Sequence, residues 1–266
     1  LTRTTPQEVS MRSAHPSSFM VVTAGHHRTF IDGRPRTEGM PVRPLSEEEV
    51  PVFSRILADS DMDGLFGAAV LKAYRPDAEV VFTHAAAMRS GMMDGFVDRS
   101  TALVDLPFHP ACGWYVDHHM TNRPDEEAAK AFAAAGGTQH WEATPSAARL
   151  AYDLLADITQ MDHLTDMMPV VDALDSGGIS KKEFLEDAPL LQLARTCTSR
   201  DPEYMRHLVG LLTGGASAEV LLNDSTVQKR LREVVDERVV ALEHVKANTT
   251  VVDRLAICRF DETPLR

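Results

Sequence analysis

The sequence predicts an α/β protein with a mostly parallel sheet covered by helices on both faces, followed by a helical connector. Between about residues 51 and 180, short apolar runs typical of buried strands alternate with segments of helical spacing. After about residue 180 the strand signals fade and helical patterns dominate. Because parallel strands are joined by crossover connections, usually helices, this alternation favours a parallel sheet that is buried on both faces.

The individual elements follow from local pattern. Buried strands are expected at residues 52–58, 78–83, 101–106 and 114–116. A helix is expected at residues 64–74, where apolar residues recur at helical spacing. Acidic residues after Pro124 and the glycine pair at residues 136–137 predict the start and end of a second helix, and Thr144-Pro145 predicts the start of a third.

The remaining segments suggest a division into four parts. Residues 1–50 read as an N-terminal extension with one strand at residues 19–22, and residues 51–180 as the catalytic domain. Residues 181–248 read as a connector with helices at residues 181–196, 202–212 and 218–246. A strand at residues 251–260 predicts that residues 249–266 begin a truncated C-terminal domain, and the start at Leu1 predicts a fragment or a processed product.

Composition predicts a water-soluble protein. The chain has 266 residues, of which 44% are hydrophobic and 25% charged, and no apolar run approaches the ~20 residues that span a bilayer. The three cysteines are scattered, without metal-ligand spacing, and are expected to be reduced thiols in a cytoplasmic protein. The net charge of −12 disfavours tight binding of a long nucleic acid but allows a small phosphorylated substrate held mainly by metal ions.

Four apolar runs end in an aspartate. These aspartates are Asp59, Asp105, Asp117 and Asp172. In an open parallel sheet the carboxyl ends of the strands lie along one edge, so carboxylates distant in sequence can converge there. A single aspartate after a strand is commonly only a turn residue or a helix cap. Four such runs together favour a ligand site.

The first run continues as Asp59-Ser60-Asp61-Met62-Asp63-Gly64. Alternate aspartates also occur in calcium loops of the EF-hand type, but Val70 stands where that loop needs a glutamate. The third run continues as Asp117-His118-His119, which places a carboxylate beside two imidazoles. This donor set suits manganese or magnesium, and two such ions about 3.5–4 Å apart can activate a water molecule.

In order and spacing, these segments resemble motifs I to IV of the DHH phosphoesterases, over about residues 52 to 180. The matching segments are residues 59–64, 102–105, 117–119 and 170–172. The first motif is most similar to that of RecJ-type exonucleases, because Arg55 stands where other branches of the superfamily carry a histidine. The resemblance implies two divalent metal ions, with Mn²⁺ favoured over Mg²⁺. The metal ligands that it implies are Asp59, Asp61, Asp63, Asp105, Asp117, His118 and Asp172.

The resemblance also implies individual roles. Asp105 would bridge the two ions, His118 would bind metal, and His119 would face the phosphate, which makes these three the catalytic residues. His119 would thus also bind the substrate. Arg123 is a second candidate for substrate binding, not from the resemblance but because its guanidinium could reach a phosphate. Asp63 has an alternative role in orienting its loop.

The last carboxylate ligand is left open between two residues. Asp175 is an alternative to Asp172, because the phase of residues 170–175 is not fixed by sequence. One departure from the family is clear: the glycine-rich segment with a histidine that helps to hold the substrate is absent before Arg266.

The predicted activity is hydrolysis of a phosphodiester or phosphoanhydride in a short single-stranded oligonucleotide or a small nucleotide, through water activated by two metal ions. One alternative is a phosphatase of the haloacid dehalogenase type, in which Asp61 would attack phosphorus. A second alternative is a metal- or nucleotide-binding module without turnover. A phosphoryl group trapped on Asp61 would favour the first alternative, whereas activation by two manganese ions favours the main reading.

Overall fold

The computed structural model describes residues 29–31, 34–36 and 41–259, and the chain divides into two units, Leu1–Gly39 and Met40–Arg266. In the first unit, β1 (Thr29–Ile31) and β2 (Arg34–Arg36) form an antiparallel pair that the sequence did not predict. The strand predicted at residues 19–22 lies outside the described residues. The domain boundaries predicted at residues 50, 180 and 248 stay predictions.

The second unit contains a five-stranded sheet in which every neighbouring pair is parallel, in the order β4-β3-β5-β6-β7. Its strands are β3 (Arg55–Asp59), β4 (Glu79–Thr83), β5 (Thr101–Val104), β6 (Trp114–Asp117) and β7 (Thr138–Trp141). The predicted α/β class is therefore confirmed, together with four of these strands. The sequence missed β7, whose mixed residues Thr138-Gln139-His140-Trp141 lack an apolar run.

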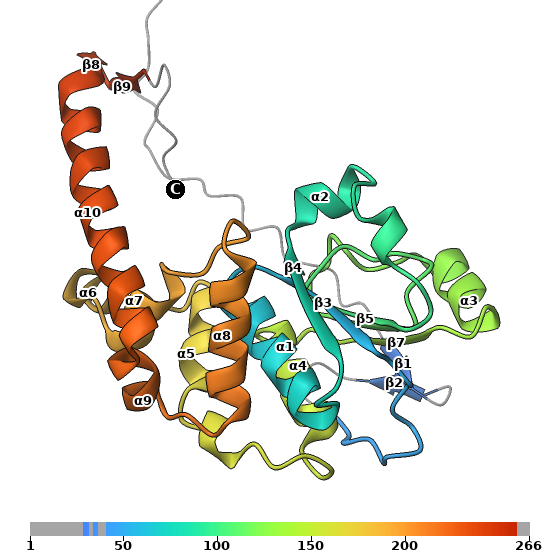
Figure 1. The fold of residues 1–266 in the computed structure, drawn as a ribbon. Helices are drawn as coiled ribbons and strands as arrows, with labels where there is room; N and C mark the ends of the chain where they lie inside the picture. Colours follow the sequence, from blue (N-terminus) through green and yellow to red (C-terminus); the bar gives the residue numbers. More distant parts are fainter. Residues whose placement is uncertain (1–28, 32–33, 37–40, 260–266) are drawn as a thin grey trace, which may run out of the picture. The chain divides into compact units, whose positions relative to one another are not determined.

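Helices cover both faces of this sheet (Figure 1). One face is covered by α1 (Met62–Tyr74), α4 (Ala147–Leu155), α5 (Met168–Asp175) and α8 (Pro202–Thr213). The other face carries α2 (Ala85–Arg89), the short 3-10 helix η1 (Asp94–Phe96) and α3 (Glu126–Ala134). A second 3-10 helix, η2 (Asp162–Leu164), precedes α5.

Both sheet faces are buried, which explains why the strands read as continuous apolar runs. Leu57, Leu103 and Tyr115 belong to the core on the α2–α3 side. Their neighbours Ala58 and Val104 point to the larger core on the α1–α4 side. Successive side chains of a strand alternate between faces, so a strand covered on both sides needs apolar residues at every position.

The fourth apolar run that ends in an aspartate is not a strand. Residues 168–172, the fourth apolar run, lie within helix α5 rather than in the sheet. Pro169 stands in the first turn of this helix, where a proline is tolerated because its missing N–H would be unpaired anyway. A short apolar run does not distinguish a buried strand from a buried helix.

The connector region contains shorter helices than predicted. Residues 181–196 form two helices, α6 (Lys181–Glu186) and α7 (Pro189–Ala194), because Asp187 adopts a left-handed conformation and Pro189 starts a new helix. Residues 218–246 form α9 (Ala218–Asn223) and α10 (Ser225–Asn248).

Asp224 ends α9 with an extended backbone and caps α10 with its side chain, which accounts for this second break. The predicted last strand is an antiparallel hairpin, β8 (Thr249–Val252) and β9 (Leu255–Cys258).

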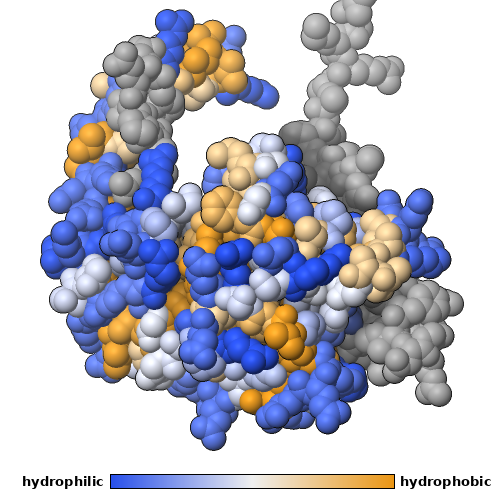
Figure 2. Space-filling model, turned by 45° about the vertical axis from the view of Figure 1, so that its right-hand side comes forward, coloured by the Kyte–Doolittle hydropathy of each residue, from blue (hydrophilic) through white to orange (hydrophobic). Residues whose placement is uncertain are grey.

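The surface of the C-terminal segment is rich in exposed hydrophobic residues. They lie on α10 from its middle onward and on the β8–β9 hairpin, in the upper left part of Figure 2. They comprise Val235, Val239, Val240, Leu242, Val251, Val252, Leu255 and Ile257. Within the described residues, no helix has the length and apolar character needed to cross a membrane.

The strand order reverses between β3 and β5. From β3 the chain crosses to β4 on one side, and then returns to β5, β6 and β7 on the other side. Ligands in open α/β sheets bind at such a reversal, outside the carboxyl ends of the strands. Gly64 makes the tight turn after β3 feasible, because a Cβ atom on it would lie 2.1 Å from the carbonyl oxygen of Asp59.

The packing of α1 on the sheet gives a stability prediction. A Cβ atom on Gly67 would lie 2.6 Å from Cγ2 of the buried, β-branched Val104, so Gly67→Ala should lower the free energy of unfolding by about 1–3 kcal/mol. Gly210, exposed in α8 with no atom within 4 Å of its added Cβ, is the matched control, and Gly210→Ala should stabilise by up to about 1 kcal/mol. Urea denaturation measures both; equal stability of the two variants would contradict this packing.

Candidate metal centre

Three neighbouring strands deliver carboxylates to the same edge of the sheet. Asp59 ends β3, Asp105 follows β5, and Asp117 ends β6. Asp59 and Asp105 thus lie at the carboxyl ends of the two strands between which the strand order reverses. Asp105 has a left-handed backbone with φ of 58°, and its N–H donates to the carbonyl of Val116. This uncommon conformation for a non-glycine residue turns the chain sharply at the strand end.

The two remaining aspartates of the first motif lie at the start of α1. Asp61 is the N-cap of α1, and its carboxylate accepts the N–H of Gly64 at 3.0 Å. Asp63 is 1% exposed and accepts the N–H groups of Ala147 and Ala148 at 2.8 and 2.6 Å. A carboxylate buried here is stabilised by the unpaired N–H groups of the first turn of α4.

The hydrogen-bond partner of one ring nitrogen of His118 shows that this nitrogen carries a proton. Its Nδ1 lies 3.0 Å from the carbonyl oxygen of Thr144, which only accepts, so Nδ1 carries a proton. The other nitrogen, Nε2, lies 3.0 Å from Oδ2 of Asp175 and 3.5 Å from Oδ2 of Asp63. In the neutral ring, Nε2 therefore presents a lone pair to two carboxylate oxygens.

This arrangement fits a divalent cation. The atoms Asp105 Oδ1 and His118 Nε2 are both buried, and neither has a hydrogen-bond partner among the described residues. Two overlapping sets of side chains each bring their donor atoms within 4.8 Å of one another. One set is Asp105, Asp117, His118 and His119, and the other is Asp63, His118 and Asp175. Histidines that bind metal commonly donate their other N–H to a carbonyl or carboxylate, as His118 does to Thr144.

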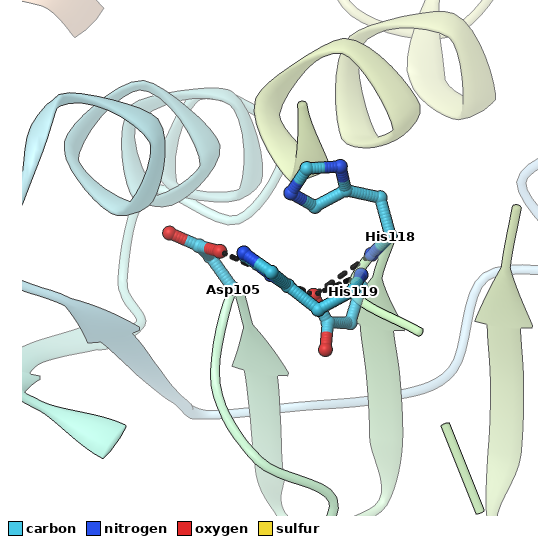
Figure 3. A group of neighbouring side chains, drawn as sticks. Asp105, His118 and His119 are labelled. Carbon is cyan, nitrogen blue, oxygen red and sulfur yellow. Dashed lines mark hydrogen bonds and ion pairs between the residues drawn. The ribbon is translucent and has the colours of Figure 1, made fainter. Parts of the chain in front are cut away.

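His119 is held between two carboxylates. Its Nδ1 lies 3.1 Å from Oδ1 of Asp117 and 3.3 Å from Oδ1 of Asp105, and the side chains of Asp105 and His119 point toward one another in Figure 3. Asp117 is fully buried; its Oδ1 accepts the backbone N–H groups of His118 and His119, and its Oδ2 accepts the hydroxyl of Tyr115 at 2.7 Å. The side chain of His119 is 41% exposed and is thus accessible to a ligand.

The predicted last ligand lies elsewhere. Asp172 is not part of either donor set; its carboxylate accepts from Ser146 and Arg149. Asp175, which the sequence analysis kept as the alternative, contacts His118 instead. Both residues belong to α5, where the sequence analysis expected a strand, and the helical phase decides which of them faces the site.

Arg123 lies beside the centre rather than in it. Its guanidinium stacks over Trp141, 4.3 Å from the ring centroid, and the indole N–H of Trp141 donates to the carbonyl of His119. Two partners of the centre were not expected from the sequence. The carbonyl of Thr144 accepts from His118, and the hydroxyl of Tyr115 donates to Asp117. No sequence signal points to the Thr144 carbonyl, because every residue carries such a group.

Burial and mutual repulsion raise the pKa values of the carboxyl groups. Burial and the nearby Asp61 raise the pKa of Asp59 to about 6 and that of Asp63 to about 7. Burial, followed by repulsion from Asp63 and Asp61, raises the pKa of Asp105 well above its ordinary value. His118 lowers the pKa of Asp63 but does not offset the effects of burial and repulsion. A bound cation or a bound proton therefore stabilises these carboxyl groups.

The two histidines respond to the same negative charge. Burial opposes protonation of His118, but its contacts with Asp175 and Asp63 prevail and raise its pKa to about 9. The hydrogen bond to Asp117 raises the pKa of His119.

A solved structure shares this fold. It is that of PggH from Vibrio cholerae, a pGpG-specific phosphodiesterase. The TM-score is 0.57 at 21% sequence identity, and the alignment covers 76% of this chain and 66% of that chain, slightly less than two thirds of its length. An uncharacterised protein from Helicobacter pylori G27 aligns with a TM-score of 0.39 at 11% identity, covering 77% of this chain and 74% of that one.

Comparison by sequence gives no relative. No protein-family model matches the chain. A search of curated protein sequences also finds no match.

The raised pKa values predict how stability depends on pH. Between the ordinary pKa of 3.8 and the raised values of about 6 and 7, the folded metal-free protein keeps protons on Asp59 and Asp63 that the unfolded chain releases. His118, whose pKa rises from 6.5 to about 9 on folding, likewise keeps a proton in the folded protein over that pH range. The free energy of unfolding should therefore fall as the pH rises from about 4 to 9.

Thermal unfolding in EDTA and in Mn²⁺ tests this dependence. We expect the Tm in EDTA to fall from about pH 5 to pH 9, and Mn²⁺ to raise the Tm most at the upper end, because the cation replaces the protons. A Tm in EDTA that rises over this range would contradict the assigned pKa shifts.

Proposed function

We propose that this protein is a metal-dependent phosphoesterase of the DHH type, which hydrolyses a phosphodiester or phosphoanhydride in a short oligonucleotide or a small nucleotide. The observation that carries the proposal is the convergence of Asp105, Asp117, His118 and His119 within 4.8 Å at the carboxyl edge of the sheet. Their order along the chain agrees with the motif resemblance. A structure with the same fold is named as a phosphodiesterase.

The donor set divides into two groups that share His118. We propose Asp63, His118 and Asp175 around one ion, with Asp63 either a direct ligand or the group that orients the first turn of α4. Asp105 would lie between the ions, and Asp59, Asp61 and Asp117 would complete the centre. When bound, two divalent ions supply activation of a water molecule and neutralisation of the phosphoryl oxygens. Oxygen and imidazole donors without thiolates favour Mn²⁺ or Mg²⁺.

His119 is the proposed contact to the scissile phosphate. As an imidazolium it donates Nδ1–H to Asp117 and keeps Nε2–H for a phosphoryl oxygen, and the bond to Asp117 favours this charged form. The exposure of the ring agrees with access by a substrate. Arg123, fixed over Trp141, would supply a second positive charge near His119, whose carbonyl accepts from the same indole.

A small substrate agrees with the charge of the chain. At a net charge of −12, affinity for the phosphates has to come from the metal centre and a few cationic groups rather than from a basic surface. The fold-sharing phosphodiesterase is named as specific for pGpG. We therefore propose a short oligonucleotide or a small nucleotide as the substrate class.

Two other functions predict different outcomes. In a haloacid dehalogenase-type phosphatase, Asp61 would form a phosphoryl-enzyme that rapid quenching and mass spectrometry detect. Asp61 is the N-cap of α1 and accepts from Gly64, which is a structural use of the same carboxylate. A binding module would bind Mn²⁺ and nucleotide without hydrolysis.

Asp105→Asn should reduce Mn²⁺-dependent hydrolysis of bis-p-nitrophenyl phosphate, a generic phosphodiester, to the rate measured in EDTA. Asparagine is similar in shape and tolerates the left-handed backbone at this position, so the variant should remain folded and at least as stable as the metal-free wild type. Circular dichroism and urea denaturation check the fold. Normal turnover by this variant would disprove the proposed centre.

His119→Gln should lower kcat by about 10²–10³-fold, the usual loss when one group that stabilises transition-state charge is removed. Mn²⁺ affinity, measured by calorimetry, should change little. An equally large loss of Mn²⁺ affinity would make His119 a metal ligand instead of a phosphate contact.

A further inference from the structure

The start of α4 and the loop before it together contact three of the four motif segments. The N–H groups of Ala147 and Ala148 donate to Asp63 of the first motif. In the loop just before this turn, the carbonyl of Thr144 accepts Nδ1–H of His118 from the third motif. The hydroxyl of Thr144 donates to the carbonyl of Ser146, which ties the loop to the helix start.

The same turn also binds the segment of the fourth motif. Oδ1 of Asp172 accepts the hydroxyl of Ser146 at 2.8 Å, and Oδ2 accepts both Nε and Nη2 of Arg149, at 3.0 and 2.8 Å. The side chains of Arg149 and Asp172 are 24% and 17% exposed. Two donors from one guanidinium fix direction as well as distance. Both oxygens of Asp172 are thus already used within the protein.

Asp175 lies on the same helix, three residues after Asp172, and its Oδ2 is 3.0 Å from Nε2 of His118. Residues three apart on a helix lie on neighbouring positions of one face. A bond that fixes Asp172 against the start of α4 therefore also fixes where Asp175 lies. The carbonyl that orients His118 belongs to the loop before the same turn.

We propose that Ser146, Arg149 and Asp172 are positioning residues, which attach α5 to the start of α4 and so hold Asp175 and His118 at the distance that a shared cation requires. The inference rests on the proposed function. It assigns Asp172 to a supporting role that neither its place in the sequence nor its acidity reveals. Removal of such supporting partners commonly weakens metal binding by about 10–100-fold.

Mn²⁺ calorimetry on a set of variants tests the proposal. Asp172→Asn and Arg149→Met should each weaken Mn²⁺ binding by about 10–100-fold, and the double variant should lose no more than the stronger single one, because both changes break one bond. Arg149→Lys keeps the charge but not the two-donor geometry, and should resemble Arg149→Met. Asp175→Asn removes a ligand and should lose more.

Asp153→Asn is the matched control. Asp153 is the other carboxylate beside Arg149, and its Oδ1 lies 3.9 Å from Nη1. It takes no part in the hydrogen bonds that connect α4 to Asp172 and His118. Its replacement should leave Mn²⁺ affinity unchanged. If Asp172→Asn loses Mn²⁺ binding as completely as Asp175→Asn while Arg149→Met keeps the wild-type affinity, Asp172 is a ligand and the proposal is overturned.

A measurement without metal separates this proposal from the proposed function. In EDTA, the ¹⁵N chemical shifts of the His118 ring should change in Asp172→Asn and Arg149→Met, and remain as in the wild type in Asp153→Asn. Unchanged His118 shifts in both former variants would overturn the positioning role. Failure of the wild type to bind Mn²⁺ would count against the proposed function, and the His118 shifts would still decide the positioning role.

Discussion

The concentration of acidic groups at the carboxyl edge of the parallel sheet is the main electrostatic constraint on this protein. Buried carboxylates repel one another and lose hydration, and the raised pKa values of Asp59, Asp63 and Asp105 record both effects. Such a cluster is unfavourable for a folded protein unless protons or cations neutralise it. The presence of this cluster, together with the uncommon backbone conformation of Asp105, agrees with a function that uses the negative charge.

Much of the fold was predictable because two physical patterns are strong. Strands buried on both faces carry apolar residues at every position, so β3, β5 and β6 were visible as runs that end in Asp59, Asp105 and Asp117. Helix starts were visible through proline and acidic residues. The edge strand β7 was not visible in the sequence, because Gln139 and His140 stand where a central strand would have apolar residues. The apolar run at residues 168–172 is compatible with either a buried strand or a buried helix. In the structure it forms part of helix α5, which packs against α1 and α4.

The site was predictable to the extent that parallel topology brings strand ends together. The convergence of Asp105, Asp117, His118 and His119 follows from that topology alone. The choice between Asp172 and Asp175 depended on the phase of a helix, and hence on tertiary packing that sequence does not encode locally. The partners that orient the site, such as the Thr144 carbonyl, are backbone atoms or lie on α4, which precedes the fourth motif by many residues. Sequence order therefore identifies the chemistry of the centre better than its supports.

The proposed function requires a pair of divalent ions at this edge of the sheet. Anomalous diffraction from a crystal grown with Mn²⁺ tests it most directly. We expect two peaks about 3.5–4 Å apart, one near His118 and Asp175 and the other near Asp59, both within reach of Asp105. No peak, or a single peak remote from Asp105 and His118, would contradict it.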